Sequence, residues 1–261
     1  MTMVLRRAGE RAASARDEWA RRATLASEPR PEGIAGPRIH LFLDELRAIA
    51  DRRGGERDAR RIVGNHHALR PQPVMLLPGF GAHPMRMRRM SRSLAAAGHR
   101  VEEWGLGVNM GPTEENFAFL MDRVASLAAY HAAPISLVGW SMGGMFAREL
   151  ARRQPHNVRK VITLGTPFSG DRRANNVWRA YHLVTGRSVD VEPIAGCDYT
   201  TKPPVPTIAI WSARDGIVAP RTACGRAHER DRAVALRCNH MGFPRDPRAI
   251  IEVLRQLDWD D

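Results

Sequence analysis

Short apolar runs alternate with longer segments of helical periodicity from residue 73 onward. This alternation predicts parallel strands joined by crossover helices. Strands are expected at residues 74–77, 101–106, 135–139, 160–164, 205–211 and 233–237, and helices near 85–97, 113–131, 142–154 and 247–257. Thr113, followed by acidic residues, is a helix start signal, and Gly98 is a helix stop signal. We therefore expect an α/β fold with a doubly wound, mainly parallel sheet of six strands.

Two regions depart from this rhythm. Residues 1–70 are expected to form an N-terminal extension, with helices at 6–26 and 39–50 and a linker at 54–73 that is rich in charges. Residues 169–204 form a far longer connection than usual and contain aromatic and aliphatic side chains, which predicts a lid. A surface loop is the alternative. The main domain would then span residues 71–261.

Composition favours one soluble globular domain. The chain has 261 residues, 43% hydrophobic and 26% charged, without a run long enough to cross a bilayer and without a secretory signal, so we expect a cytoplasmic protein. Its net charge of +12 comes almost entirely from Arg and is not gathered in one tail, which argues against specific nucleic-acid binding. Peripheral contact of the basic N-terminal helices with anionic membranes is the alternative.

The three cysteines have no metal-type spacing, so no metal site is expected. Free buried thiols are the simplest interpretation. A disulfide between Cys224 and Cys238 remains open for an oxidising compartment.

The sharpest motif is Gly-Trp-Ser-Met-Gly at residues 139–143, which lies between an apolar strand and a helix. A strand-to-helix turn of this kind holds Ser141 in a strained conformation that exposes its hydroxyl. Gly139 and Gly143 are needed because a Cβ there would collide with neighbouring elements. Ser141 is therefore the candidate nucleophile.

A serine hydroxyl needs a histidine base and a carboxylate that orients the base. In folds with this turn, the acid and then the histidine follow at later strand ends. Asp215 comes directly after the apolar run 205–211, and His240 follows the next expected strand. His228 and the histidines that precede Asp215 fit this order less well, and Asp246 is better placed as a helix cap.

The oxyanion formed during acyl transfer needs two N–H donors. Met142, directly after the candidate nucleophile, would supply one. The turn after the first strand would supply the other from Phe80, with Gly79 and Gly81 allowing the main chain to approach the substrate.

Five motifs together resemble the lipase and esterase branch of the α/β-hydrolase superfamily, over about residues 73–258. They are Pro78-Gly79-Phe80-Gly81, the turn at 139–143, Leu164-Gly165-Thr166-Pro167-Phe168, Asp215-Gly216-Ile217-Val218 and His240-Met241-Gly242. The resemblance implies a bacterial esterase-like serine hydrolase with a triad of Ser141, His240 and Asp215, and no cofactor. This chain departs from many lipases in having Pro78 where they have His, and in lacking two opening antiparallel strands.

The leading hypothesis is hydrolysis of a small apolar carboxylic ester through an acyl-enzyme. Thioesterase, lactonase or amidase activity on the same triad is the alternative, as is a non-catalytic binding protein. The expected substrate-binding residues are Gly79, Trp140, Phe168, Trp178 and Tyr181. The oligomeric state is left open.

Overall fold

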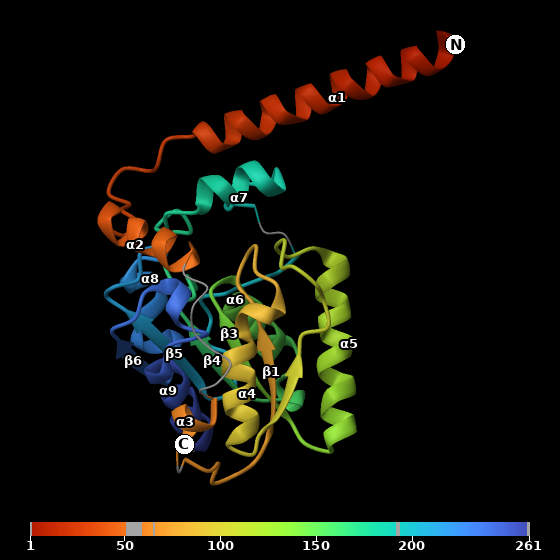
Figure 1. Cartoon of the computed structure of the whole chain (residues 1–261). Coiled ribbons are helices and arrows are strands. Elements are labelled where there is room, and N and C mark those ends of the chain that lie inside the picture. The colour runs from red at the N-terminus through yellow and green to blue at the C-terminus, as the bar shows by residue number, and fades with distance from the viewer. Residues whose placement is uncertain (1, 51–58, 65, 192–193, 260–261) are drawn as a thin grey trace.

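The computed structural model, which describes residues 2–50, 59–64, 66–191 and 194–259, is built on one six-stranded sheet (Figure 1). Every neighbouring pair of strands is parallel, and the strand order is β2-β1-β3-β4-β5-β6. The strands are β1 (Pro73–Leu77), β2 (Arg100–Glu103), β3 (Ile135–Trp140), β4 (Val158–Leu164), β5 (Thr207–Ser212) and β6 (Arg232–Leu236). The predicted doubly wound sheet is confirmed.

Helices cover both faces of this sheet. One face carries α5 (Glu114–His131) and α6 (Met142–Arg153), and the other carries α3 (Ala59–Val63), α4 (Arg88–Ala96) and α9 (Pro247–Asp258). The carboxyl ends of the parallel strands therefore form a single edge, where the loops that follow the strands meet.

Strand β1 shows how the two layers are built. Met75 and Leu77 enter the core with α5 and α6, whereas Val74 and Leu76 enter the core with α4 and α9. Successive side chains of a strand point to opposite faces, so a continuous apolar run is buried on both. Each such side chain contributes about 1.5–3 kcal/mol through burial.

Several boundaries differ from the predicted ones, for local reasons. Strand β2 ends at Glu103, before the predicted residue 106, because Gly105 has a positive φ of 87° that leaves the extended conformation. The helix predicted at 85–97 is divided into the 3₁₀ turn η2 (Pro84–Met87) and α4. The start of α5 agrees with its predicted signal, because Thr113 and Asn116 form a reciprocal capping box.

The N-terminal region contains α1 (Thr2–Ser27) and α2 (Ile39–Ala50), as predicted. The predicted linker at 54–73 includes the short helix α3. Residues 51–58 lie outside the described part of the chain. Helix α1 runs over α7 (Trp178–Thr185), the helix within the 169–204 segment, and extends past the main body (Figure 1). None of the helices in the described residues has the length and apolar character to span a membrane.

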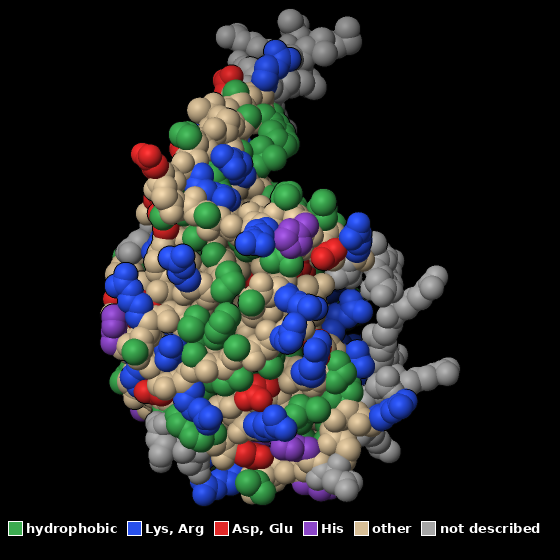
Figure 2. All heavy atoms as spheres, turned by 90° about the vertical axis from the view of Figure 1, so that its left-hand side faces the viewer, with side chains coloured by type: hydrophobic (Ala, Val, Ile, Leu, Met, Phe, Trp, Pro, Cys, Tyr) green, Lys and Arg blue, Asp and Glu red, His purple; other side chains and the backbone are tan. Residues whose placement is uncertain are grey.

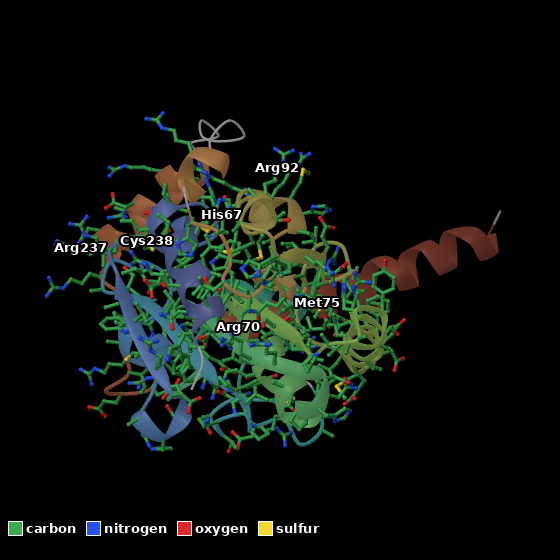
Figure 3. The ribbon with its side chains drawn as sticks, turned by 90° about the horizontal axis from the view of Figure 1, so that it is seen from below. His67, Arg70, Met75, Arg92, Arg237 and Cys238 are labelled. Atoms are coloured by element: carbon green, nitrogen blue, oxygen red, sulfur yellow. The ribbon has the colours of Figure 1, made fainter. Side chains whose placement is uncertain are left out.

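Basic side chains are dispersed over the surface. Figure 2 shows Lys and Arg spread across one face, with hydrophobic and acidic side chains between them. From below, Met75 lies within the sheet, whereas Arg92 and Arg237 point outward at the periphery (Figure 3).

The thiols of Cys197, Cys224 and Cys238 are all free in this structure. Cys197 and Cys238 are buried as expected, but Cys224 is partly exposed.

Candidate active site

Ser141 lies at the sharp turn between β3 and α6. Its backbone has φ 54° and ψ −124°, a region that residues with a side chain rarely adopt, and such a conformation costs about 1–3 kcal/mol. The turn is fastened to the neighbouring strand, because the Ser141 N–H donates to the Leu164 carbonyl at 2.8 Å. The side chain is thereby presented at the carboxyl edge of the sheet.

Glycines permit this turn because α6 lies directly against two strands. A Cβ on Gly139 would overlap backbone atoms of Gly143 and Gly144, and a Cβ on Gly143 would overlap the carbonyl oxygen of Leu77. The predicted steric role of both flanking glycines is confirmed.

Asp215 and His240 meet at the same edge of the sheet, although they come from different loops. His240 Nδ1 lies 2.7 Å from Asp215 Oδ2, and both side chains are almost completely buried. The other carboxylate oxygen of Asp215 accepts from the N–H groups of Ile217 at 2.8 Å and Val218 at 2.7 Å. These bonds fix the carboxylate so that it can orient the imidazole ring.

The imidazole ring of His240 is enclosed by aromatic side chains. The Trp140 ring lies with its centroid 5.8 Å away, and its indole N–H donates to the His240 carbonyl at 3.1 Å. Phe243 packs edge-on at 6.1 Å. The ring position is therefore set by packing as well as by Asp215.

The pKa of His240 reflects opposing effects. Burial lowers it, but the negative charge of Asp215, the hydrogen bond to that residue and the charge of Glu45 together outweigh burial. The pKa of His240 consequently lies above its ordinary value, and the imidazolium form is favoured.

The loop after β1 passes beside Ser141. A Cβ on Gly79 would lie 3.1 Å from the Ser141 Cβ, so the absence of a side chain allows this approach. Phe80 follows, and Gly81 has a positive φ of 68°. The second expected N–H donor, Met142, is the first residue of α6, where an N–H has no acceptor within the helix.

Asn109 holds this loop in place, and sequence reasoning did not identify it. Its side-chain amide donates to the Pro78 carbonyl at 2.7 Å, and its backbone carbonyl accepts from the Gly81 N–H at 2.7 Å. Asn109 is completely buried. No local pattern marks this residue, because it follows β2 and its contacts are made across the sheet edge.

A mostly apolar pocket opens beside Ser141, with a cavity volume of about 90 Å³. Its wall comes from the loop after β1, from α5 and α6, and from the 169–204 segment. The lining residues include Phe80, Met142, Met145, Phe146, Trp178, Tyr181 and Ile194. The aromatic rings of Phe80 and Tyr181 meet edge-on at 5.2 Å and so join the β1 loop to α7.

Only two of the five expected substrate-binding residues line this pocket. Trp178 and Tyr181 line the pocket, as does Phe80. Trp140 instead packs on His240, and Gly79 lies beside Ser141. Phe168 is buried under the guanidinium of Arg148, 4.1 Å from its ring centre, and does not line this pocket.

Glu45 was also missed. Its carboxylate reaches the loops that carry Asp215 and His240 from helix α2. A signal was present, since Glu45 stands at helical spacing from Leu41, Phe42 and Ile49, within the expected apolar face of that helix. Two members of that expected face, Ile39 and Leu46, are instead exposed, by 69% and 48%.

Comparisons with known proteins agree with this architecture. Residues 72–190 match a family model described as the alpha/beta hydrolase fold. A pimeloyl-[acyl-carrier protein] methyl ester esterase of Chromobacterium violaceum is 34% identical over 96 residues. That match covers 36% of this chain and 36% of the relative, so the chain spans about a third of this relative's length.

Two solved lipases share the fold at low sequence identity. Lipase B of Aspergillus fumigatus superposes with a TM-score of 0.57 at 17% identity, covering 89% of this chain and 63% of that one. The lipase BlEst2 of Bacillus licheniformis gives a TM-score of 0.55 at 15% identity, covering 75% of this chain and 95% of that one. Together with the match to the family model and the parallel six-stranded sheet, these likenesses show that the chain has the α/β-hydrolase fold.

Proposed function

We propose that this protein is a serine hydrolase that cleaves carboxylic esters with an apolar acyl or alcohol group. The observation that carries the proposal is the hydrogen bond of 2.7 Å between His240 and Asp215 at the strand edge that also presents Ser141 in a strained turn. Nucleophile, orienting acid and base, in this chain order, are the requirement for acyl transfer on this fold.

In the proposed reaction, His240 Nε2 takes the proton of the Ser141 hydroxyl as its oxygen attacks the ester carbonyl carbon. The carbonyl oxygen becomes an oxyanion that accepts from the N–H groups of Phe80 and Met142. When the intermediate collapses, the bond to the alcohol oxygen breaks and His240 returns the proton to the leaving alkoxide. Water then attacks the acyl-enzyme while His240 accepts its proton. When this second intermediate collapses, the acid is released and His240 returns the proton to the Ser141 oxygen.

The pocket supports an apolar substrate. Its lining is mostly aromatic and aliphatic, and such surfaces bind by removing apolar area from water. Met142 and Met145 on α6 and Trp178 and Tyr181 on α7 face the same space. We assign the acyl or alcohol chain of the ester to this space.

Changing Ser141→Ala tests the proposal. Wild type is expected to hydrolyse short p-nitrophenyl esters and to be labelled by a fluorophosphonate probe, whereas the variant should do neither, because it lacks the attacking oxygen. Intact-mass spectrometry after labelling reports the covalent adduct. Ester turnover that persists in Ser141→Ala would overturn the assignment, and a wild type that the probe leaves unlabelled would favour a non-catalytic binding protein.

The same triad chemistry can act on thioesters, lactones and amides. A panel in which each class carries the same acyl chain separates these alternatives through kcat/KM. The proposal expects the oxygen ester to be cleaved fastest.

A further inference from the structure

Helix α2 of the N-terminal extension lies against the loops that carry the proposed acid and base. Its backbone touches the acid loop directly, since a Cβ on Gly216 would overlap the Leu41 carbonyl and the Phe42 nitrogen. Phe42 also packs with Ile217 and Met241 in a small apolar cluster. The extension is thus part of the wall behind the active site.

Glu45 projects from this helix into the space between the two loops, where it is fully buried. Its Oε1 accepts from the Gly216 N–H at 2.9 Å and from the His240 N–H at 2.5 Å, and its Oε2 accepts from the Met241 N–H at 2.9 Å. All three partners are donors, so the group that satisfies them is the acceptor-only carboxylate. Bonds from charged acceptors to backbone N–H groups are about twice as strong as neutral ones.

The Glu45 carboxylate joins three backbone N–H groups, on two loops that must keep a fixed separation. Gly216 directly follows Asp215, and Met241 directly follows His240. One carboxylate therefore holds the main chain on both sides of the hydrogen bond between the acid and the imidazole. A small displacement of either loop would change the direction in which the imidazole meets Ser141, and misplacement by about 1 Å can reduce turnover by about 100-fold.

We propose that Glu45 is a positioning residue of the catalytic centre: it fixes the loops of Asp215 and His240 relative to each other and, as a second buried negative charge, stabilises the imidazolium formed when His240 takes the serine proton. This inference rests on the proposed function. It assigns a mechanistic role to the N-terminal extension, which lies outside residues 72–190 of the family match.

The electrostatic part follows from the groups around the ring. Burial lowers the pKa of His240, whereas Asp215 from the loop after β5 and Glu45 from α2 raise it. The nearby Cys238 thiol stays neutral because burial raises its pKa to about 12. Since the net pKa is raised, His240 remains protonated to higher pH, and the acid limb of kcat/KM lies above the ordinary histidine range. Removing the charge of Glu45 therefore moves that limb to lower pH.

The test compares Glu45→Gln with Asp44→Asn in the full chain. Asp44 is the adjacent residue of the same helix and forms only an exposed pair with Arg47, at 2.8 Å. In Glu45→Gln the amide NH₂ faces backbone donors, so kcat should fall by about 100-fold with little change in KM, and the acid limb should move to lower pH. Asp44→Asn should match wild type in all three measurements.

Glu45→Asp separates charge from position, and it also serves if Glu45→Gln fails to fold. It keeps the negative charge on a side chain one methylene shorter, so its acid limb should stay near that of wild type while kcat falls. Wild-type kcat in Glu45→Gln would overturn the proposal. So would a fall in kcat without movement of the acid limb, since that result indicates a merely structural role.

NMR titration of the His240 imidazole provides a readout that does not depend on turnover. The ring should titrate at lower pH in Glu45→Gln than in wild type. If wild type neither labels with the fluorophosphonate nor cleaves esters, the proposed function fails, while this titration still decides whether Glu45 acts on the ring. If wild type is active and the ring titrates identically in both proteins, only the role of Glu45 fails.

Discussion

The backbone bend at Ser141 depends on residues that have no side chain. Gly143 of α6 lies so close to β1 that a Cβ would overlap the carbonyl oxygens of Leu77 and Pro78. Backbone atoms at the end of a buried strand have little room to move away, unlike the end of a flexible side chain. The positions of Ser141 and of the loop that carries Phe80 are consequently linked through one glycine.

We therefore expect Gly143→Ala to destabilise the protein by about 1–3 kcal/mol, as overpacked sites do, and to lower Tm by about 2–4 °C per kcal/mol. Activity should fall further than stability alone explains, because α6 and the β1 loop must separate. Gly107→Ala is the matched control, since an added Cβ there meets nothing within 4 Å. Thermal denaturation and ester kinetics measure both effects, and equal Tm values for the two variants would contradict this account.

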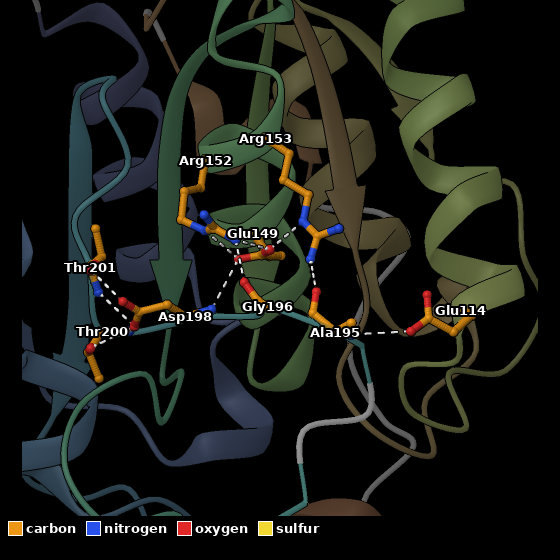
Figure 4. Close-up of polar contacts among 9 residues, drawn as sticks. All are labelled: Glu114, Glu149, Arg152, Arg153, Ala195, Gly196, Asp198, Thr200 and Thr201. Atoms are coloured by element: carbon orange, nitrogen blue, oxygen red, sulfur yellow. Dashed lines mark hydrogen bonds and ion pairs between the residues drawn. The ribbon is translucent and has the colours of Figure 1, made fainter.

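At the scale of elements, the returning part of the 169–204 segment is fastened to α6, the helix that begins beside Ser141. Figure 4 shows Glu149 at the centre of these contacts. It pairs with Arg152 at 2.6 Å and Arg153 at 2.5 Å. The same two guanidinium groups donate to the carbonyls of Gly196 at 2.6 Å and Ala195 at 2.8 Å. The base of the proposed lid is thereby held on a rigid helix.

A second set of bonds shapes the next turn of this segment. Asp198 accepts from the side chains and backbone N–H groups of Thr200 and Thr201 (Figure 4). The hydrogen bonds from Thr201 and Thr200 hold the pKa of Asp198 well below its usual range. The turn is therefore ordered by local bonds that persist as long as Asp198 is ionised.

Changing Glu149→Gln should loosen this base, because two arginines lose their common carboxylate. We expect a loss of about 1–3 kcal/mol in stability, less than for a fully buried pair since both arginines are partly exposed. Hydrogen exchange should increase at residues 194–201. The exposed pair of Asp44 and Arg47 has the same sequence spacing as Glu149 and Arg152, so Asp44→Asn controls for loss of a helical ion pair. Unchanged hydrogen exchange in Glu149→Gln would show that Arg152 and Arg153 hold the carbonyls of Gly196 and Ala195 without help from Glu149.

At the scale of the whole molecule, the pocket is assembled from parts that are distant in sequence. Helix α7 forms part of its wall and is held by α1, where Arg22 donates to the Val184 carbonyl at 2.8 Å and His182 Nδ1 contacts the Leu25 carbonyl at 3.0 Å. The cavity, about 90 Å³, is small beside the roughly 300–1,000 Å³ typical of ligand pockets. So small a volume fits a short linear acyl chain better than a bulkier branched or aromatic one.

This pocket predicts that kcat/KM rises from acetate to butyrate p-nitrophenyl esters, by up to about fourfold per methylene, the equivalent of about 0.8 kcal/mol for each buried CH₂ group. Branched acyl groups of the same carbon number should be cleaved more slowly. Steady-state kinetics across linear and branched esters measure this. Rates that stay level or fall between acetate and butyrate would contradict an apolar acyl site.

Much of the fold and of the candidate site could be read from local pattern. The inner strands β1, β3, β4 and β5 follow from short apolar runs, because strands buried on both faces need no polar alternation. The edge strands β2 and β6 are only partly buried. Ser141, Asp215 and His240 were identifiable because each follows a strand, and parallel strands end at one edge. The hydrogen bond between Asp215 and His240 agrees with that reasoning, since it joins residues 25 apart in sequence.

Only the tertiary structure decided which distant residues contact and position the candidate site. Glu45 reaches Gly216 and His240 across 171 and 195 residues, and Asn109 reaches Pro78 across 31. Trp140 and Phe168, both expected at the substrate, pack instead against His240 and Arg148. Local sequence determines which segments become strands and helices through periodicity and sterics. Which buried polar group satisfies which distant partner depends on how the packed elements meet, and no local pattern contains that information.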